Sequence, residues 1–207
     1  MAEHKRSDRI VDVASVVLIS VAAVLTALCS YQSGRWGGQQ ARLYSLASAD
    51  HMRSVSESDR ANTLTAIDVG VFLRYMDAVV SGDKRMTEFL HRRMRPEMQP
   101  AMRAWLATNP LQNLHAPASP FTMQQYSLRS RSDANRWDAQ GRREYEEAID
   151  ANRHSDDFLL LTVIFAAVSF LAGISTKMAY PRHAIVVALA AVATIYGFVR
   201  LVSLPFL

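Results

Sequence analysis

The sequence lacks a second cysteine and the sequence motifs by which many enzymes are recognised. It has a single cysteine, Cys29, so no disulfide bond can form within the chain. No glycine-rich phosphate loop and no serine elbow is present. The six histidines have no metal-ligand spacing, and solvated or capping roles suit them better than a metal site assembled from distant helices. We therefore expect no catalytic residues, no metal, no cofactor and no enzymatic activity.

The chain also lacks a large excess of charge of either sign. The formal net charge is only +4, and residues 31–157 carry 17 Lys and Arg against 16 Asp and Glu. A nucleic-acid-binding domain needs a one-sided basic surface. The nearly neutral central stretch predicts that nucleic acid is not a partner.

Three long apolar tracts are the strongest signal that is present. They cover residues 13–29, 158–176 and 184–199, the last continuing past Arg200 to Leu204. Each approaches the roughly 20 residues that a helix needs to cross a hydrocarbon core of about 30 Å. The tracts predict a membrane protein with transmembrane helices at residues 10–30, 158–176 and 184–204, and with the lipid bilayer as its first partner.

The first tract has one alternative, a cleaved signal peptide, because Lys5, Arg6 and Arg9 precede an apolar run. The run is long for a signal peptide, Asp12 lies at its start, and no clean cleavage site follows. These features favour an uncleaved membrane anchor.

The positive charges in the short segments predict the orientation. Lys5, Arg6 and Arg9 lie in the tail at residues 1–9, and Lys177 and Arg182 lie in the loop at 177–183. The positive-inside rule places both segments in the cytoplasm. This puts residues 31–157 and the C-terminal end at 205–207 outside the cytoplasm. Asp12 is then expected to face Arg9, Lys177 or Arg182.

The central stretch reads as helical, because alternating β-branched runs with Asn-Gly or Asp-Gly turns are absent. Residues 31–55 have no proline and are predicted to continue the first transmembrane helix. A second helix is predicted to begin after Ser58 or Asp59, both good N-cap residues, and to end near Gly82. Its apolar stripe comprises Leu64, Ile67, Val71, Tyr75 and Val79.

Shorter elements follow. Asp83 is predicted to cap a short helix whose apolar face comprises Met86, Phe89, Leu90 and Met94. Residues 101–108 resume the helix, and the prolines in 109–121 predict an extended loop. From residue 122 a long helix is expected to run into the second span. The predicted fold class is an all-α membrane protein, with three transmembrane helices and an extracytoplasmic helical bundle at residues 31–157 inserted between the first and second.

Small residues recur where helices are expected to pack closely. Two ladders follow the first span, and further pairs lie within the second and third. Such faces let another helix approach, although glycines near the interface could instead merely bend the helix. The predicted helix-packing residues are Gly34, Gly37, Gly38, Ala41, Ser45, Gly173 and Gly197, together with Ser30 and Ala49 in the ladders.

Two groups of charged residues are candidate sites. Arg200 near the outer end of the third span is predicted to form an interfacial ion pair with Asp156 and Asp157, since charges at membrane depth usually find partners. Snorkelling of Arg200 to the interface is the alternative. A possible anion patch is formed by Arg92, Arg93, Arg95 and Arg103, although local partners such as Glu88 and Glu97 would make it an ordinary solvated face.

Several short motifs resemble those of a widespread family of small bacterial three-span inner-membrane proteins. They are Tyr31-Gln32 with Arg35-Trp36, Arg95-Pro96-Glu97, Pro100-Ala101, the run 104–110 (AWLATNP), Ser119-Pro120-Phe121 and Ala172-Gly173-Ile174-Ser175. The resemblance covers nearly the whole chain and implies the three-span topology and a bacterial source. The family has no established activity, so no catalytic residues carry over.

These observations predict a non-enzymatic integral membrane protein. It is expected to act by binding, scaffolding or sensing within a homo-oligomer or with a membrane-protein partner. The alternative is a pore-forming or transport-complex subunit, which would show conductance or flux.

Overall fold

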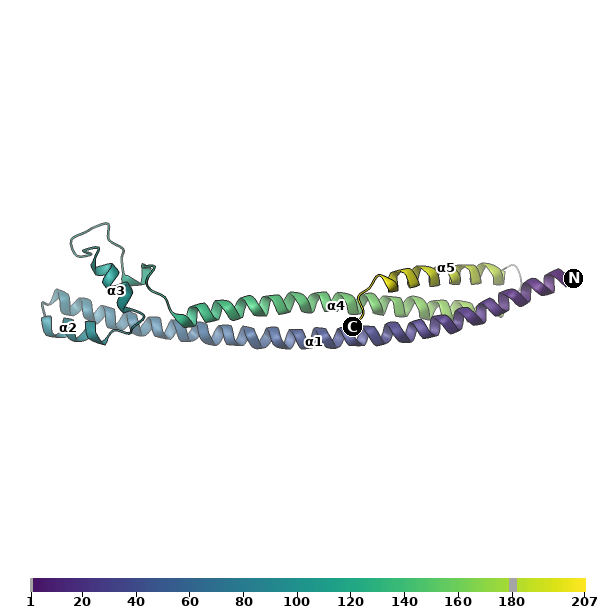
Figure 1. The fold of residues 1–207 in the computed structure, drawn as a ribbon, viewed down its shortest axis with the longest axis horizontal. Helices are drawn as coiled ribbons and strands as arrows, with labels where there is room; N and C mark the ends of the chain where they lie inside the picture. The colour runs from purple at the N-terminus through teal and green to yellow at the C-terminus, as the bar shows by residue number, and fades with distance from the viewer. Residues whose placement is uncertain (1, 179–181) are drawn as a thin grey trace. The chain divides into compact units, whose positions relative to one another are not determined.

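The computed structural model describes residues 2–178 and 182–207, with side chains from residue 11 onward. Over these residues the protein is all-α and contains no strand, as predicted. Residues 179–181 of the predicted cytoplasmic loop lie outside the described part. The elements, labelled in Figure 1, are α1 (Ala2–Val80), α2 (Lys84–Arg93), α3 (Gln99–Leu106), the 3₁₀ helix η1 (Pro120–Thr122), α4 (Arg129–Ser175) and α5 (Arg182–Val202).

Three of these helices, α1, α4 and α5, are long and apolar enough to cross a membrane. They contain the three apolar tracts recognised in the sequence. The prediction of three apolar helices of membrane-spanning length is therefore confirmed.

Helix α1 is longer than predicted, because it continues without interruption to Val80. The predicted start of a separate helix at Ser58 or Asp59 is wrong. Both are common N-cap residues, but a cap acts only where the preceding chain leaves the helical conformation. Residues 39–69 contain neither proline nor glycine, and the first proline of the chain is Pro96. Nothing in the backbone therefore ends the helix before Gly82.

The end of α1 follows from local chemistry. Gly82 has a φ of 75°, a left-handed conformation that costs glycine little. Its N–H donates to Val79 O at 3.2 Å, and Asp83 N–H donates to Ala78 O at 3.0 Å, which together form a Schellman motif. The Asp83 carboxylate then accepts the Met86 N–H at 2.9 Å and caps α2. The predicted glycine cap and Asp83 N-cap are both confirmed.

The chain divides into two compact units, and α1 and α4 each contribute to both. Unit 1 comprises Met1–Leu46 and Glu144–Leu207, and unit 2 comprises Ala47–Arg143. In unit 1, α5 lies alongside α4 (Figure 1). The buried core of unit 1 takes residues from α1, α4 and α5: Ala22, Leu25, Cys29, Phe158, Leu161, Phe165, Val168, Ala190 and Leu201.

The segment after α5 is held against α1 by two polar side chains. The buried amide of Gln32 accepts the Leu207 N–H at 3.1 Å, and its Nε2 lies 3.3 Å from Leu207 O. The indole N–H of Trp36 donates to Pro205 O at 3.1 Å. Gln32 and Trp36 thus bind backbone groups that have no partner within a helix. In the sequence these two residues stood out only as parts of a motif.

Unit 2 has its own core, built from the C-terminal part of α1, from α3 and from the segments around them. Its buried residues are Phe72, Tyr75, Met94, Met98, Met102 and Trp105. The Phe72 ring meets Trp105 edge-on at 5.2 Å, and the Trp105 N–H donates to Pro117 O at 2.7 Å, which anchors the loop before η1.

Two details of unit 2 differ from prediction. Ile67 is half exposed and does not belong to the buried stripe of α1, whereas Phe72, which was not assigned to that stripe, is buried. Helix α4 begins at Arg129 and not at residue 122. Met123 and Tyr126 pack against the core of unit 2 before the helix starts, and this tertiary packing overrides the local helical spacing.

Close packing of α5 on α4 depends on Gly197. A Cβ atom at this position would lie 2.8 Å from Cε1 and Cζ of Phe165, whose side chain is fully buried. We predict that Gly197→Ala destabilises the protein by about 1–3 kcal/mol, the usual cost of overpacking.

The matched control is Gly173→Ala in α4, where a Cβ would meet nothing within 4 Å. Thermal unfolding of the purified proteins in detergent measures both variants. Equal melting temperatures for the two would show that the Phe165 ring moves aside freely.

Candidate functional site

A buried carboxylate organises unit 2. Asp68 in α1 is 1% exposed, and its Oδ2 lies 3.2 Å from Arg95 Nη1. The Tyr126 hydroxyl donates to the same oxygen at 3.0 Å. Arg95 extends the network through Nη2, which lies 3.0 Å from Glu97 Oε2. The network therefore ties α1 to the turn before α3 and to the segment before α4.

The position of Asp68 explains why it needs these partners. It lies on the face of α1 that also buries Ala61, Phe72 and Tyr75. An ionised carboxylate on an apolar face is costly unless it is paired and hydrogen-bonded. Burial raises the pKa of Asp68 above its ordinary 3.8, while the hydrogen bond from Tyr126 and the charge of Arg95 act in the opposite direction. The pKa of Tyr126 is also raised, chiefly by burial.

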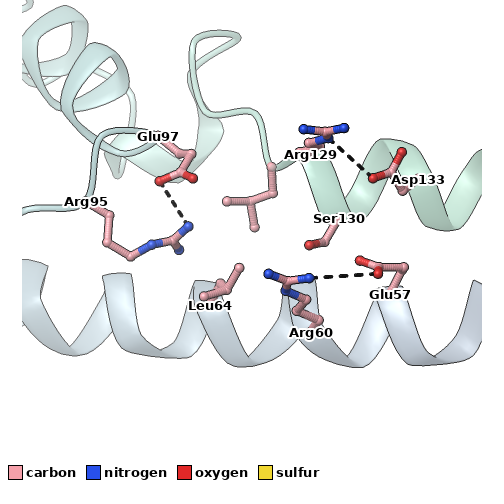
Figure 2. Close-up of a pocket in the computed structure, with 9 residues that line it drawn as sticks. Glu57, Arg60, Leu64, Arg95, Glu97, Arg129, Ser130 and Asp133 are labelled. Atoms are coloured by element: carbon pink, nitrogen blue, oxygen red, sulfur yellow. Dashed lines mark ion pairs between the residues drawn. The ribbon is translucent and has the colours of Figure 1, made fainter.

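A pocket of about 430 Å³ lies beside this network, entirely within unit 2. Its walls come from α1, from the turn at residues 95–97 and from the start of α4 (Figure 2). Three guanidinium groups and three carboxylates line it, with two leucines and a serine: Glu57, Arg60, Leu64, Arg95, Glu97, Leu128, Arg129, Ser130 and Asp133.

The arginines of the pocket differ in how firmly they are held. Arg95 lies between two carboxylates and is 23% exposed. Arg60 and Arg129 are 69% and 92% exposed, and their nearest carboxylate oxygens, on Glu57 and Asp133, are 3.9 and 3.7 Å away. Exposed pairs at such distances contribute little stability. Arg60 and Arg129 are therefore available to a ligand, whereas Arg95 forms part of the wall.

The four arginines of the predicted anion patch have different surroundings. Arg92 lies 3.4 Å from Glu88, and Arg93 lies over the Phe89 ring. Arg103 is exposed on α3, and only Arg95 lines the pocket. The sequence suggested a patch because these arginines lie close together in the chain. Their order in the chain does not show that Arg95 turns toward Asp68. Arg60, Arg129 and Ser130 were missed, since they are distant from Arg95 in the chain and carry no motif.

Of the two acids predicted to pair with Arg200, the structure places one beside it. Arg200 Nη2 lies 3.9 Å from Asp157 Oδ1, and both side chains are partly exposed. Asp156 accepts a hydrogen bond from Asn152 Nδ2 at 3.0 Å instead. Helical rotation points consecutive residues in directions about 100° apart, so two adjacent acids rarely reach the same partner.

A polar cluster joins the three apolar helices at one end. The fully buried Ser15 Oγ of α1 lies 3.4 Å from Ser175 Oγ of α4 and 3.3 Å from His183 Nε2 of α5. Asp12 Oδ1 is 3.9 Å from His183 Nδ1. The serine, histidine and aspartate follow the order of a hydrolase triad, but a fully buried serine cannot reach a substrate. We interpret the cluster as a polar connection between helices.

This cluster bears on the predicted partners of Asp12. Arg9 lies outside the residues whose side chains are described, and neither Lys177 nor Arg182 forms an ion pair with Asp12 among the described side chains. His183 had no sequence signal of its own, because only the folding back of α5 on α4 brings it near Ser15.

The predicted helix-packing residues divide into two groups. Gly197 faces Phe165, and a Cβ at Gly37 would lie 3.7 Å from Ser155 Oγ. A Cβ at Gly34, Gly38 or Gly173 would meet nothing within 4 Å. Ala41 and Ser45 are exposed. Packing between the helices of unit 1 therefore uses some of the small residues and leaves the others uncovered.

No protein-family model, curated protein or solved structure matches this chain. The family resemblance drawn from its motifs therefore stays a prediction. Among the described side chains, no group of three His, Cys, Asp or Glu residues could hold a metal ion.

The Asp68–Arg95 pair gives the first test of the site. We predict that Arg95→Met destabilises the protein by about 3–5 kcal/mol, because the carboxylate is left buried without its cation. Adding Asp68→Asn should recover most of this loss, since a neutral amide needs no counter-charge. Unfolding of the three variants in detergent forms a double-mutant cycle. Fully additive losses would mean that the two side chains do not interact.

The same cycle has an expected pH dependence. Because the pKa of Asp68 is raised in the folded state, the folded protein retains this proton to a higher pH than the unfolded chain does. The free energy of unfolding of the wild type, relative to Asp68→Asn, should therefore fall as pH rises above 3.8 and level off once the folded carboxyl has ionised. If the free energy of unfolding of the wild type relative to Asp68→Asn rose with pH over this window, the pKa of Asp68 would not be raised in the folded state.

Proposed function

We propose that this chain is a non-enzymatic, multi-pass protein of the bacterial inner membrane that acts by binding, scaffolding or sensing. Residues 31–157 form its extracytoplasmic helical bundle, and the N-terminus is cytoplasmic. The protein works as a homo-oligomer or within a larger membrane complex. The observation that carries this proposal is an uncovered face of small residues on α1.

Five small residues of α1 form this face, which we call the small-residue stripe. They are exposed and spaced by four, four, three and four positions: Ser30, Gly34, Gly38, Ala41 and Ser45. Residues three and four apart lie on the same side of a helix, so the stripe is continuous. Gly37, which faces Ser155 of α4, does not belong to it.

The small-residue stripe suits a neighbouring helix. Gly34 and Gly38 have open space where a side chain would be, so another backbone can approach closely. Glycine in a helix interior costs about 1 kcal/mol relative to alanine. Two uncovered glycines therefore favour a role in association with a second copy or a partner helix.

A pore or transport subunit is the second candidate, and the hydroxyls of the apolar helices argue against it. Ser20, Thr26, Thr162, Ser169 and Thr194 each donate to the carbonyl four residues earlier in their own helix. These groups are satisfied locally and need no aqueous path. We expect no ion conductance from the purified protein in planar bilayers.

We predict that Gly34→Leu and Ala41→Leu each lower the oligomeric state, because a large side chain blocks close approach along the small-residue stripe. The measurement is size-exclusion chromatography with light scattering in mild detergent, together with crosslinking in native membranes.

The matched controls are Gly70→Leu and Ala66→Leu, exposed positions of the same helix outside the stripe. Neither should change the oligomeric state. A wild-type protein that is monomeric in detergent and uncrosslinked in membranes would refute the proposal.

The orientation has its own test. A cysteine at exposed Asn113, in a variant whose buried Cys29 is replaced by serine, should react with an impermeant maleimide in intact spheroplasts. A cysteine at Thr176, at the proposed cytoplasmic end of α4, should react only after lysis. If the cysteine at Thr176 reacted in intact spheroplasts and the one at Asn113 only after lysis, the topology would be the reverse of the proposed one.

A further inference from the structure

We propose that the pocket of unit 2 binds a small zwitterion that carries one carboxylate and one ammonium group. This inference deepens the proposed binding function and rests on it. It follows from the way charge, burial and apolar surface are distributed around the pocket.

One end of the pocket carries an excess of negative charge. Arg95 is ion-paired with both Asp68 and Glu97, so one cation meets two anions and the group has a net charge of −1. Asp68 is buried behind Arg95, whereas Glu97 is 43% exposed and uses only Oε2 in its ion pair. Glu97 Oε1 is thus in a position to accept a hydrogen bond from a ligand ammonium group.

The other end carries an excess of positive charge. Arg60 lies near Glu57, and Asp133 lies between Arg129 and Arg136. With Arg136, which lies outside the lining, three cations and two anions leave a net charge of +1 around this end. Arg60 and Arg129 are loosely held and border the pocket from α1 and α4 (Figure 2). Their planar forks match a carboxylate, to which arginine donates two parallel hydrogen bonds.

Ser130 adds a hydroxyl group to the lining at this end. It is 7% exposed, lines the pocket, and its hydroxyl forms no hydrogen bond with the described side chains or backbone. The hydroxyl oxygen itself is not fully buried, so it is accessible to a ligand in the pocket. Ser130 also lies in the first turn of α4, where the N–H groups of Arg131 and Ser132 donate to Leu128 O and those of Arg129 and Ser130 have no carbonyl partner within the helix and favour an anion. A carboxylate held between Arg60 and Arg129 would satisfy these donors.

The middle of the pocket is apolar. Leu64 of α1 and Leu128 before α4 line it, and Leu128 is buried. A short methylene chain packs well against such a surface. The pocket therefore presents a positive end, an apolar middle and a negative end, which together match a linear amino carboxylate.

Isothermal titration calorimetry on the full chain in detergent tests this assignment. The probes are linear ω-amino carboxylates from glycine to 6-aminohexanoate, with alkanoates and alkylamines of the same lengths. Because each charged hydrogen bond adds to affinity, we expect one amino carboxylate length to bind about tenfold or more tightly than its matched alkanoate and alkylamine.

Two variants separate the ends of the pocket. Arg129→Gln should weaken the binding of amino carboxylates and of alkanoates by about tenfold. Glu97→Gln should weaken the binding of amino carboxylates by a similar factor and leave that of alkanoates unchanged or stronger. The matched controls are Arg92→Gln and Glu88→Gln, an exposed pair on α2 outside the pocket. Because Arg129, Arg92 and Glu88 are largely exposed, these three variants should keep the wild-type melting temperature. Glu97 is 43% exposed and pairs with Arg95, so retained alkanoate binding serves as the check that Glu97→Gln is folded.

Three outcomes would overturn the inference. Alkanoates that bind as tightly as amino carboxylates would indicate a simple anion site. Equal losses in Arg92→Gln and Arg129→Gln would place binding outside the pocket. If no probe bound to the folded protein, the pocket would not be a binding site for these ligands. Self-association through the small-residue stripe is measured separately, so failure of the zwitterion site and failure of the proposed function give different results.

Discussion

Uninterrupted backbone hydrogen bonding in α1 is the constraint on which the rest of the structure depends. The chain has no proline before Pro96, so α1 continues from the first apolar tract to Val80. A helix satisfies its own backbone groups, which is a requirement in lipid and an advantage in water. The same helix therefore supplies core residues to both units, Leu25 to unit 1 and Phe72 to unit 2.

Within unit 2 the burial of one carboxylate has large consequences. Because Asp68 lies on the apolar face of α1, its charge has to be balanced from elsewhere in the chain. Arg95 and Tyr126 provide the partners, and they hold two irregular segments beside α1. Those segments and the start of α4 are the walls of the pocket. The candidate site is thus a consequence of how the unit compensates a buried charge.

Unit 1 shows a different use of polar groups. Ser15, Ser175 and His183 meet among apolar side chains at one end, while Gln32 and Trp36 bind the backbone of residues 205–207. Ser15 and Ser175 also donate to carbonyls of their own helices, Val11 O and Ala172 O. The contacts between helices define how α1, α4 and α5 pack, while the small-residue stripe stays exposed.

The sequence by itself determined the features that depend on neighbouring residues. Apolar length predicted the three candidate spans, and the residue types at Gly82 and Asp83 predicted the end of α1 and the cap of α2. These signals are local, because the physical cause lies within a few residues of the effect. Ser58 and Asp59 show the limit of such signals, since good cap residues do not end a helix that nothing else interrupts.

Only the tertiary structure decided which side chains meet. It placed Asp157 and not Asp156 beside Arg200, turned Arg95 toward Asp68, and brought His183 to Ser15. It also separated the covered Gly37 from the open Gly34. Apart from Arg95, which lies in the turn before α3, these outcomes depend on the rotation of one helix about its axis relative to its neighbours. The packing of whole helix faces against each other sets that rotation. The spacing of residues within one helix does not predict it.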